Sequence, residues 1–369
     1  MSTIIIGAGA SGLAAAISLK QRLASEKVII LERLSSAGKK ILATGNGRCN
    51  LTNRYADGYD EVKAFFKNIG LMLCEEEQGR IYPYSLKAET VLDILLEACH
   101  NLNIKIITDC EVTEIEKDLT VHSPKGVFKA DNIIVATGGK AQKNLGSDGS
   151  GYTLLKKLGH STTDLTPALV QLTSSSKYPR AIKGTRTRCD LKIELDGRIE
   201  GEEHGEILFT DYGLSGIAAM NLSYIVSENF AKENPKKCTA VLDLIPEMNK
   251  EDISDYIKKF GSLRGILGRK LSDIISKQAD NDAEKTASFA KNWRLILTGT
   301  KGFDFAQITN GGIPLDEIHD YQSTKIKNLY ICGEILDKQF PCGGFNLDFA
   351  WQSGIKTANR IVEKKNDTN

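Results

Sequence analysis

The sequence predicts an α/β protein whose parallel-sheet domain is interrupted by a β-rich segment and then by a helical one. An apolar strand, a glycine-rich turn and a helix open the chain within residues 3–19. A short apolar strand lies at 328–332, near the other end. That strand needs a parallel sheet to bury both of its faces, so we expect the two ends of the chain to fold together.

The opening of the chain is typical of a dinucleotide-binding unit. The apolar run Thr3–Ile6 leads into Gly7-Ala8-Gly9-Ala10-Ser11-Gly12, and a small apolar helix follows at 13–19. Gly7 permits the tight turn, Gly9 lets a pyrophosphate approach the backbone, and Gly12 lets the helix pack against the strand. The N-terminus of the helix then faces the phosphates.

A second strand supports this interpretation. Val28–Leu31 is apolar and ends in Glu32, twenty residues past Gly12. An acid at this distance can accept hydrogen bonds from a ribose. A glycine turn in an unrelated α/β unit would leave Glu32 unexplained.

The chain continues to alternate between strands and helices up to residue 139. Apolar spacing predicts a helix over 91–99. We expect strands at 104–107, 111–115 and 132–139, and a hairpin within 118–129. The polar segment 140–151, which contains three glycines, is interpreted as a linker.

The pattern changes twice in the middle of the chain. Short strands are expected at 168–172, 191–195 and 205–209, and Asp196-Gly197 marks a hairpin turn. Residues 247–298 are charged and have helical spacing. After the strand at 328–332, a closing helix is expected from 347 to about 364. The sequence thus predicts a β-rich inserted domain, then helices, then a return to the parallel sheet.

Composition limits the functions that the chain can have. The 369 residues include 48 Lys and Arg against 47 Asp and Glu, a formal net charge of +1, which gives no field to attract nucleic acid or an anionic membrane. No apolar stretch is long enough to span a bilayer. The chain begins almost directly with a strand, which leaves no room for a cleavable signal. We expect a cytoplasmic protein without nucleic-acid or membrane partners.

Cysteine spacing argues against a metal site. The eight cysteines, at 49, 74, 99, 110, 189, 238, 332 and 342, form no Cys-x-x-Cys pair, and only five histidines are present. This excludes the usual patterns of a structural zinc site and of a thioredoxin-like pair. We expect most of these thiols to be reduced and buried.

Only one Gly-x-Gly-x-x-Gly fingerprint is present, so one nucleotide is held firmly, either FAD or NAD(P). Two features favour FAD. Tyr330-Ile331-Cys332-Gly333-Glu334 is a second strand–Gly–acid element, as a long cofactor with a ribityl chain requires. Gly343-Gly344 opens a helix whose N-terminal dipole can stabilise negative charge at the flavin N1–C2=O edge.

The segment Gly38–Asn53, which reads GKKILATGNGRCNLTN, resembles the signature of the BaiN-type flavoprotein family. Its members are known broadly as NAD(P)/FAD-dependent oxidoreductases and include bile-acid reductases and aminoacetone oxidases. Further segments resemble the family in the same order: 79–85, 136–139, 205–216, and 333–337 leading to 343–347. The resemblance covers nearly the whole chain, and Arg48-Cys49-Asn50 and Gly343–Asn346 are its specific parts.

The resemblance implies a Rossmann-like FAD-binding domain, interrupted by a barrel-like domain and a small helical domain. We expect residues 1–150 and 300–369 to form the discontinuous FAD domain, 160–245 the β-rich substrate domain, and 246–299 the helical domain. Two departures matter for the substrate. Lys140-Ala141-Gln142 stands where the family often has Ser-Tyr-Pro, and Cys342 stands where it often has Thr.

The loop at 38–53 has a chemical rationale. Arg48 can meet a phosphate or a developing flavin anion through a fixed fork of donors. The amides of Asn46, Asn50 and Asn53 can bond the flavin N–H groups and carbonyls. Cys49 and Cys342 are expected to pack rather than react. The expected cofactor contacts are Gly7, Gly9, Ala10, Ser11, Gly12, Glu32, Arg33, Lys40, Gly45, Asn46, Arg48, Cys49, Asn50, Val112, Thr137, Gly138, Gly333, Glu334, Gly344, Phe345, Asn346 and Leu347.

The sequence therefore predicts an FAD-dependent oxidoreductase that acts on a small molecule. The first interpretation is a reductase of an unsaturated or carbonyl substrate, with hydride transfer at flavin N5 and NAD(P)H as a transient co-substrate. An O₂-using amine oxidase of the aminoacetone type is the second, and a flavin-binding module without turnover is the third. No motif marks a catalytic acid or base, a hydrolase or a kinase. The polar residues Lys301, Asp304, Tyr212 and His204 lie on candidate substrate-facing loops.

Overall fold

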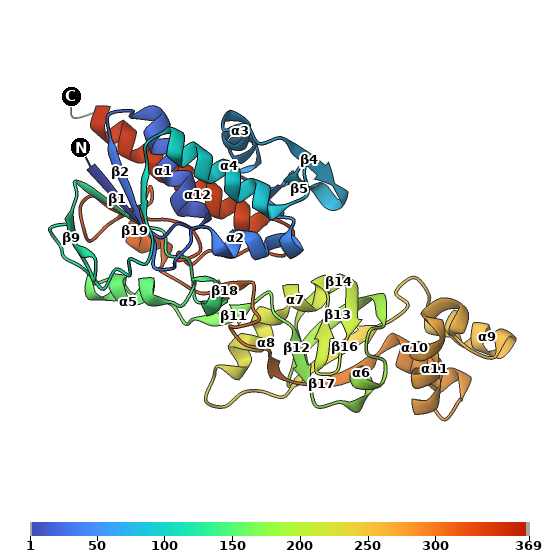
Figure 1. Ribbon diagram of the computed structural model, residues 1–369. Coiled ribbons are helices and arrows are strands. Elements are labelled where there is room, and N and C mark those ends of the chain that lie inside the picture. The colour runs from blue at the N-terminus through green and yellow to red at the C-terminus, as the bar shows by residue number, and fades with distance from the viewer. Residues whose placement is uncertain (1, 367–369) are drawn as a thin grey trace. The chain divides into compact units, whose positions relative to one another are not determined.

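The computed structural model describes residues 2–366, which form two compact units. Unit 1 combines the described residues up to Leu165 with those from Ile308 onward, and unit 2 is Thr166–Gln307. The chain colours in Figure 1 show the N-terminal and C-terminal segments folded together in unit 1. The fold is a Rossmann-type α/β domain together with an antiparallel barrel and helices, as the sequence predicts.

A seven-stranded sheet in the order β19-β20-β21-β10-β1-β2-β6 forms the centre of unit 1. Its strands are β1 (Ser2–Ile6), β2 (Lys27–Leu31), β6 (Lys105–Ile107), β10 (Asn132–Val135), β19 (Ile318–His319), β20 (Gln322–Ser323) and β21 (Leu329–Ile331). The strands β21, β10, β1, β2 and β6 are parallel, and Ile133 pairs with Leu329. The C-terminal strand β21 therefore joins the N-terminal sheet, as its two apolar faces require.

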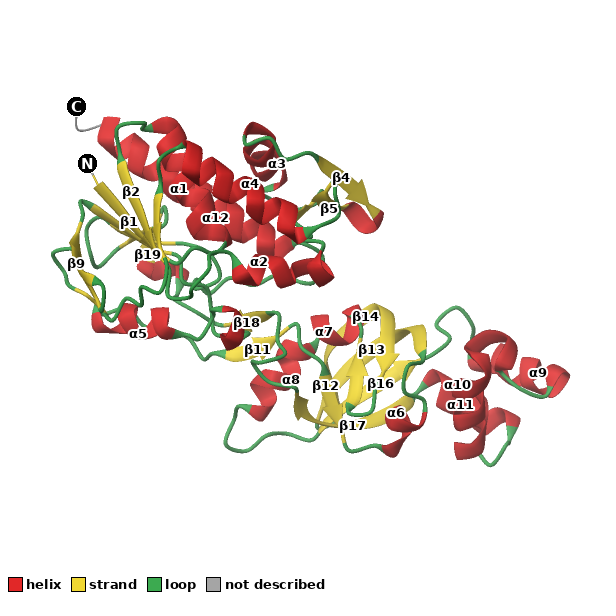
Figure 2. Cartoon of the chain, viewed as in Figure 1, coloured by secondary structure: helices red, strands yellow, loops and turns green. Residues whose placement is uncertain are grey.

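Helices cover this sheet because both of its faces carry Ile, Val and Leu (Figure 2). The helices of unit 1 are α1 (Ala10–Arg22), α2 (Lys39–Ala43), α3 (Tyr59–Asn68), α4 (Ala88–Asn101), α5 (Ser150–Lys157) and α12 (Phe345–Asn366). Residues of α1, α4 and α12 share one apolar cluster with one face of the sheet, and residues of α5 share another with the opposite face. The helices α1 and α12 pack closely, since a Cβ on Gly354 would lie 2.2 Å from the Ser11 carbonyl oxygen.

Shorter elements complete unit 1. They are β3 (Thr52–Asn53), β4 (Leu73–Glu76), β5 (Arg80–Pro83), β7 (Glu114–Ile115), β8 (Thr120–Ser123), β9 (Gly126–Lys129), β18 (Ile308–Asn310), and the 3-10 turns η1 (Thr44–Gly47), η2 (Glu77–Gly79), η3 (Lys143–Leu145) and η4 (Leu315–Glu317). The strands β3, β5 and β4 form one small sheet, and β7, β8 and β9 form another. The hairpin expected within 118–129 is present as β8 and β9.

The segment 140–151 is not the linker that its polar composition predicts. It forms η3 and begins α5, and the chain leaves unit 1 only after Leu165. Gly149 N–H donates to the Gly139 carbonyl at 3.1 Å, and Arg33 donates to the Gly146 carbonyl at 3.2 Å. These hydrogen bonds hold the segment against unit 1.

Unit 2 contains a closed barrel in the order β12-β15-β14-β13-β16-β17, with every described neighbouring pair antiparallel. The strands of unit 2 are β11 (Thr166–Ala168), β12 (Leu172–Ser174), β13 (Arg186–Leu195), β14 (Arg198–Phe209), β15 (Gly213–Ser215), β16 (Cys238–Asp243) and β17 (Trp293–Thr300). Asp196 and Gly197 join β13 to β14 with φ of 51° and 84°. Two successive positive φ angles are those of the hairpin turn that this dipeptide predicts.

Helices of unit 2 pack on the barrel. They are α6 (Lys177–Ala181), α7 (Ile217–Asn221), α8 (Ser223–Phe230), α9 (Lys250–Phe260), α10 (Arg264–Gln278) and α11 (Ala283–Lys291). Ile253, Leu271 and Ala287 belong to the same apolar cluster as the barrel residues Leu242 and Trp293.

The expected helical segment extends too far along the sequence. The helices end at Lys291, and Trp293–Thr300 is the barrel strand β17. Its side chains alternate between buried and exposed along the strand. This two-residue period is that of a half-buried strand, and the preceding helical pattern obscured it.

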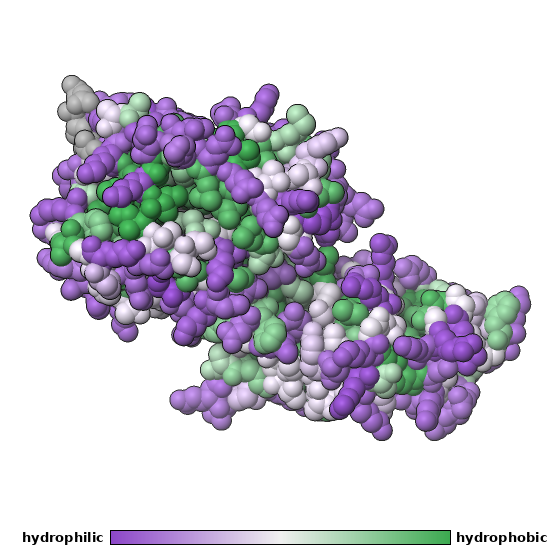
Figure 3. All heavy atoms as spheres, in the orientation of Figure 1, coloured by the Kyte–Doolittle hydropathy of each residue, from purple (hydrophilic) through white to green (hydrophobic). Residues whose placement is uncertain are grey.

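Hydrophilic side chains cover much of the visible face of each unit (Figure 3). None of the helices within residues 2–366 has the length and apolar character needed to cross a membrane. Over the same residues, no group of three or more His, Cys, Asp or Glu side chains is arranged to hold a metal ion.

A buried polar network connects the loop after α5 to β20 and η4. His160 Nδ1 lies 2.7 Å from the Glu317 carboxylate, and His160 Nε2 lies 2.8 Å from Ser323 Oγ. The order Ser–His–Glu resembles a hydrolase triad. However, Ser323 is 4% exposed, and its hydroxyl oxygen accepts from the backbone N–H groups of Lys325 and Ile326 at 3.0 Å each. The network is therefore structural.

This network makes stability depend on pH. Burial lowers the pKa of His160. Burial acts to raise the pKa of Glu317, but hydrogen bonds from Lys325, Ser161 and His160 outweigh it and lower that pKa to about 2. In an unfolded chain the pKa of a histidine is about 6.5 and that of a glutamate is about 4.3. The unfolded chain thus binds more protons, so stability falls as pH drops below about 6.5, and again between about 4.3 and 2.

We expect His160→Asn to flatten the decline of Tm between about pH 7 and pH 5, because the variant has no imidazole to titrate. Thermal unfolding at constant ionic strength measures this slope. His100→Asn, which changes an exposed histidine at the end of α4, is the matched control. Equal slopes in the wild type and both variants would contradict the prediction.

Candidate functional site

The glycine-rich turn lies between β1 and α1 in unit 1. Gly7 has a φ of 104°, and its N–H donates to the Leu31 carbonyl at 2.8 Å. A Cβ on Gly12 would lie 2.0 Å from the Gly7 carbonyl oxygen, so only glycine allows this approach of helix to strand. A Cβ on Gly9 would meet no atom within 4 Å. The space beside Gly9 is therefore open at the N-terminus of α1, where a pyrophosphate binds in this kind of turn.

Glu32 supports the turn from the end of β2. Its Oε2 accepts from the Ala8 N–H at 2.8 Å, and its Oε1 accepts from the Leu34 N–H at 2.9 Å. Each carboxylate oxygen can accept a further hydrogen bond. Glu32 can therefore fix the glycine turn and bind a ribose at the same time.

A small cavity of about 50 Å³ lies beside Glu32. Among the predicted cofactor contacts, Gly7, Glu32, Arg33, Val112 and Thr137 line it. The fold thus brings together residues from widely separated parts of the sequence. Glu111, Gly146 and Ser150 also line the cavity but were missed. The last two lie in the segment interpreted as a linker.

Two residues that line this cavity are Arg33, which forms an ion pair, and Thr137, which carries a buried hydroxyl. Arg33 Nη2 lies 3.4 Å from the Asp148 carboxylate. Burial acts to raise the pKa of Asp148, but hydrogen bonds from Ser150 and the charge of Arg33 lower it. Thr137 Oγ1 is buried and has no hydrogen-bond partner among residues 2–366. A bound ligand can provide that partner.

The second strand–Gly–acid element lies beside the first. A Cβ on Gly333 would approach Ser11 Oγ to 2.4 Å, so the end of β21 lies against the start of α1. Lys40 Nζ is 2.9 Å from the Glu334 carboxylate and 3.3 Å from the Ala141 carbonyl oxygen. The Glu334 carboxylate also accepts from the Thr309 N–H at 3.0 Å. The two ends of the chain thus contribute to one surface of unit 1.

The loop from Gly45 to Asn50 is held by contacts that the sequence did not predict. Arg48 is bonded to Glu76, and its guanidinium lies 4.4 Å from the centre of the Tyr82 ring. Cys49 is fully buried, and burial raises the pKa of its thiol to about 12, with the Thr44 hydroxyl opposing. Its side chain therefore packs, and only its backbone remains for a ligand. Gly45 and Asn46 are exposed.

The start of α12 meets this loop. A Cβ on Gly344 would lie 2.6 Å from the Thr52 carbonyl oxygen and 2.9 Å from Asn50 Oδ1. Asn53 Nδ2 donates to the Gly343 carbonyl at 2.9 Å. Asn50 Oδ1 is buried without a hydrogen-bond partner in the described chain. The fold therefore places an unpaired acceptor beside the helix N-terminus.

The other predicted residues of α12 have structural contacts as well. Asn346 Oδ1 accepts from the Phe340 N–H at 2.9 Å, and its Nδ2 donates to the Phe340 carbonyl at 2.7 Å. This fixes the loop before the helix. Leu347 packs against the apolar cluster that contains α1.

Asp348 is a buried residue that sequence reasoning missed. It is 3% exposed, and its carboxylate accepts from the Thr52 hydroxyl and, at 3.0 Å, from the Gly58 N–H. Burial raises the pKa of Asp348. The carboxylate fixes residues 52–58 to α12. An acid in the first turn of a helix is common, so no sequence signal distinguished it.

The candidate substrate-facing residues of unit 2 have local partners. The Lys301 ammonium lies 4.8 Å from the centre of the Tyr212 ring and 4.2 Å from that of Phe305. His204 Nδ1 is 2.6 Å from the Asp190 carboxylate on an exposed part of the barrel. Asp304 is exposed.

The residues of unit 1 fit FAD. The open space at Gly9, the cavity at Glu32, and the unpaired Thr137 and Asn50 oxygens provide donors, acceptors and room along one surface. This arrangement defines an FAD-dependent oxidoreductase. The chain belongs to the family described as HI0933-like protein Rossmann domain, whose model matches residues 1–60 and 57–360. The predicted flavoprotein family, cofactor and enzyme class are confirmed.

Two relatives match nearly the whole chain. The chain is 34% identical to the 3-dehydro-bile acid delta(4,6)-reductase of Clostridium scindens, over 98% of both proteins. It is 26% identical to the ribosomal RNA dihydrouridine synthase of Haemophilus influenzae, over 97% of this chain and 98% of that protein. Among solved structures, the open conformation of a flavocytochrome c3 fumarate reductase has the same fold, with a TM-score of 0.52 and 14% identity, covering 98% of this chain and 78% of that one.

Glu32→Ala is expected to weaken FAD binding by about 1–3 kcal/mol, because it removes the carboxylate that we expect to accept a charge-assisted hydrogen bond from the ribose. Fluorescence titration of the apoprotein with FAD measures the effect. Glu32→Gln, which keeps one acceptor oxygen, should lose less affinity. Unchanged affinity in the Ala variant would show that Glu32 serves only the Ala8 and Leu34 N–H groups.

Proposed function

We propose that this protein is an FAD-dependent reductase of a small unsaturated or carbonyl compound, with NAD(P)H as the transient electron source. The observation that carries this proposal is the 34% identity, over nearly the full length of both chains, to a protein named as a bile-acid reductase. When bound, FAD supplies hydride transfer at its N5 atom. The protein supplies binding, orientation and electrostatics.

The proposed cofactor contacts follow the surface described above. The backbone of Gly9, Ala10, Ser11 and Gly12 would hold the pyrophosphate at the N-terminus of α1. Glu32 would bind the adenosine ribose, and the cavity lined by Arg33, Val112 and Thr137, with Gly138 alongside, would take the adenine end. A second group would hold the rest of the cofactor: Lys40, Gly333, Glu334, Gly45, Asn46, Arg48, Cys49, Asn50, Gly344, Phe345, Asn346 and Leu347.

Electrostatics at the start of α12 support this assignment. The helix N-terminus carries a partial positive charge that stabilises an anion beside it. Asn50 Oδ1 lies next to the same point and has no partner in the described chain. A flavin ring edge would satisfy both features. Its N–H group would donate to Asn50 Oδ1, and its negatively polarised carbonyl would face the helix N-terminus.

A small molecule is the proposed substrate, although two relatives are named as ribosomal RNA dihydrouridine synthases. The net charge of +1 supports a small molecule, because RNA binding relies on excess positive charge. The closer relative is the bile-acid reductase, at 34% against 26% identity.

Anaerobic mixing tests the redox partner. FAD-loaded protein is mixed separately with NADH, NADPH and candidate amines, and loss of the oxidised flavin absorbance is followed. Reduction by a nicotinamide supports the reductase. Reduction by an amine alone would overturn it in favour of the O₂-using amine oxidase, and no reduction by any donor would favour a binding module without turnover.

We further propose that the two chain segments of unit 1, up to Leu165 and from Ile308 onward, form one discontinuous FAD domain, into which unit 2 is inserted as a substrate domain with its helices. The pairing of β21 with β10 supports this division. Limited proteolysis near the two ends of the insertion, at about residues 165 and 307, is expected to leave both end fragments associated with FAD. If the N-terminal fragment alone keeps full FAD affinity, the discontinuous domain is wrong.

A further inference from the structure

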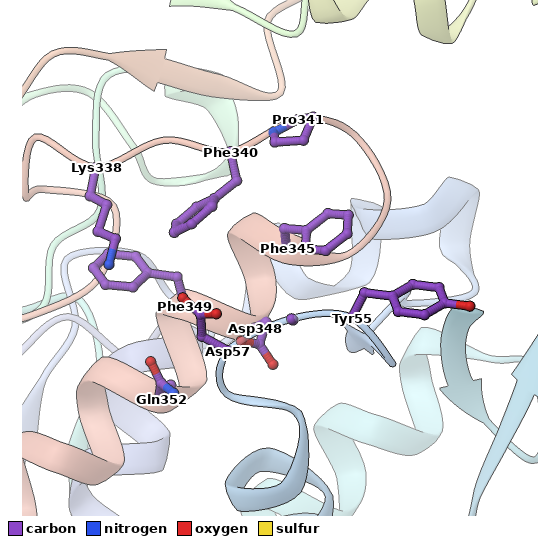
Figure 4. Close-up of a pocket in the computed structure, with 10 residues that line it drawn as sticks. Tyr55, Asp57, Lys338, Phe340, Pro341, Phe345, Asp348, Phe349 and Gln352 are labelled. Carbon is purple, nitrogen blue, oxygen red and sulfur yellow. The ribbon is translucent and has the colours of Figure 1, made fainter. Parts of the chain in front are cut away.

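A second cavity in unit 1, of about 240 Å³, has no assigned ligand. It lies between the first two turns of α12, the loop at 338–341, and residues 55–57 after β3 (Figure 4). It shares no lining residue with the cavity at Glu32. Of the proposed FAD contacts, only Phe345 lines it.

Aromatic rings form much of its wall. Phe345 and Phe349 lie on one face of α12, and Phe340 comes from the preceding loop (Figure 4). The centres of the Phe340 and Phe349 rings are 5.7 Å apart. The Lys338 ammonium lies 5.4 Å and 5.2 Å from these two ring centres. Such walls favour a planar, largely apolar body.

The polar side of the cavity carries an amide that has no partner within the protein. Gln352 lines the cavity one turn beyond Phe349 and is 7% exposed. Its carboxamide makes no hydrogen bond to any other residue in the range 2–366 that the structure describes. Asp348, in contrast, is bonded to Thr52 and Gly58. The amide atoms of Gln352 are open to the cavity, so a ligand that both donates and accepts can take the place of water there.

The charged side chains at this cavity give no preference for a cationic or an anionic ligand. Lys338 is cationic and Asp57 is anionic, and both are exposed. Selection therefore rests on the shape of the ring and on its hydrogen-bonding edge. A carboxamide or lactam edge carries a donor beside an acceptor and matches the amide of Gln352 through two parallel hydrogen bonds.

We propose that this cavity binds a planar ring that bears such an edge, with the ring between Phe340, Phe345 and Phe349 and the edge paired with Gln352. Nicotinamide, adenine and uracil all have this chemistry. The proposal is independent of which donor reduces the flavin.

Ligand-observed saturation-transfer NMR on the FAD-loaded full chain tests it, with nicotinamide, adenine and uracil as separate probes. At least one probe is expected to bind, and the probe with the highest affinity identifies the kind of compound that supplies the ring. Gln352→Leu should lower the affinity for that probe by about tenfold or more, because the two hydrogen bonds to the edge of the ring are lost. Gln21→Leu, the same change at an exposed position of α1, is the matched control.

A second comparison uses only the wild-type protein, in case Gln352→Leu fails to fold. The bound probe is replaced by its N-methylated form, in which the donor is removed: N,N-dimethylnicotinamide, N6,N6-dimethyladenine or 1,3-dimethyluracil. Binding should again fall by about tenfold. Equal binding of both forms overturns the proposal, as does equal binding to a folded Gln352→Leu variant, or no binding by any of the three probes. None of these outcomes measures reduction of the flavin by NAD(P)H, so failure of this proposal is distinguishable from failure of the proposed function.

Discussion

Gly9→Val is expected to give a folded protein that does not retain FAD. The backbone of Gly9 is extended, with φ of −85°, which any residue adopts. A Cβ at this position meets no protein atom within 4 Å, so the fold accommodates the side chain. The same side chain would fill the space in which we place the pyrophosphate. The purified variant should lack flavin absorbance and keep the Tm of the wild-type apoprotein.

Gly12→Ala provides the contrasting result. Its Cβ would lie 2.0 Å from the Gly7 carbonyl oxygen, so α1 must move away from β1. Overpacking of this kind costs about 1–3 kcal/mol of stability. We therefore expect loss of FAD without loss of Tm at Gly9, and loss of Tm at Gly12. A Gly9→Val protein that is purified with FAD would show that the pyrophosphate does not bind there.

Asp348→Ala is expected to destabilise unit 1 and to speed the release of FAD. Removal of the carboxylate leaves the Thr52 hydroxyl and the Gly58 N–H without their partner. A buried polar group left unpaired costs about 1–3 kcal/mol. Residues 52–58 would then separate more readily from the start of α12, which we assign to the cofactor. Thermal unfolding and the rate of FAD loss after dilution measure the two effects.

Two controls separate this effect from a simple change of charge. Asp57→Asn removes an exposed carboxylate from the same region and should change Tm little. Thr52→Val combined with Asp348→Ala should cost less than the sum of the two single changes, because both remove the same hydrogen bond. Additive effects, or a wild-type Tm in Asp348→Ala, would argue against this role of Asp348.

Local patterns in the sequence predicted most of the fold of unit 1. The strands Ser2–Ile6 and Lys27–Leu31 are apolar runs beside clear turn and helix signals, and the two glycines Gly7 and Gly12 occupy positions where a Cβ would clash. The strand Leu329–Ile331 was placed in the N-terminal sheet because a short strand buried on both faces requires neighbours.

The errors arose where tertiary contacts outweigh local pattern. Trp293–Thr300 follows a long helical stretch. Its alternation of buried and exposed side chains identifies it as a strand only once the barrel has closed around it. Residues 140–151 are polar and rich in glycine, but Arg33 and Gly139 hold them in unit 1. No local pattern reports such bonds.

The candidate site was proposed from the sequence in the same way. Glycines and acids at fixed spacing pointed to the residues around Gly9, Glu32 and Glu334. The pairing of Arg48 with Glu76 depends on a neighbouring sheet, and that of Asp348 with Thr52 joins residues 296 positions apart. Motif spacing carries no information about such partners. For the same reason Gln352 attracted no attention in the sequence, since a single amide within a helix has no pattern.

The pairing of β21 with β10 sets an order of events during synthesis. About 190 residues separate Val135 from Leu329, and β10 remains an open sheet edge until β21 leaves the ribosome. At about 5–20 residues per second this takes about 10–40 s. An unpaired edge rich in Ile and Val is prone to join other chains. Nascent chains halted before Leu329 should therefore recruit chaperones or aggregate, whereas completed chains should not.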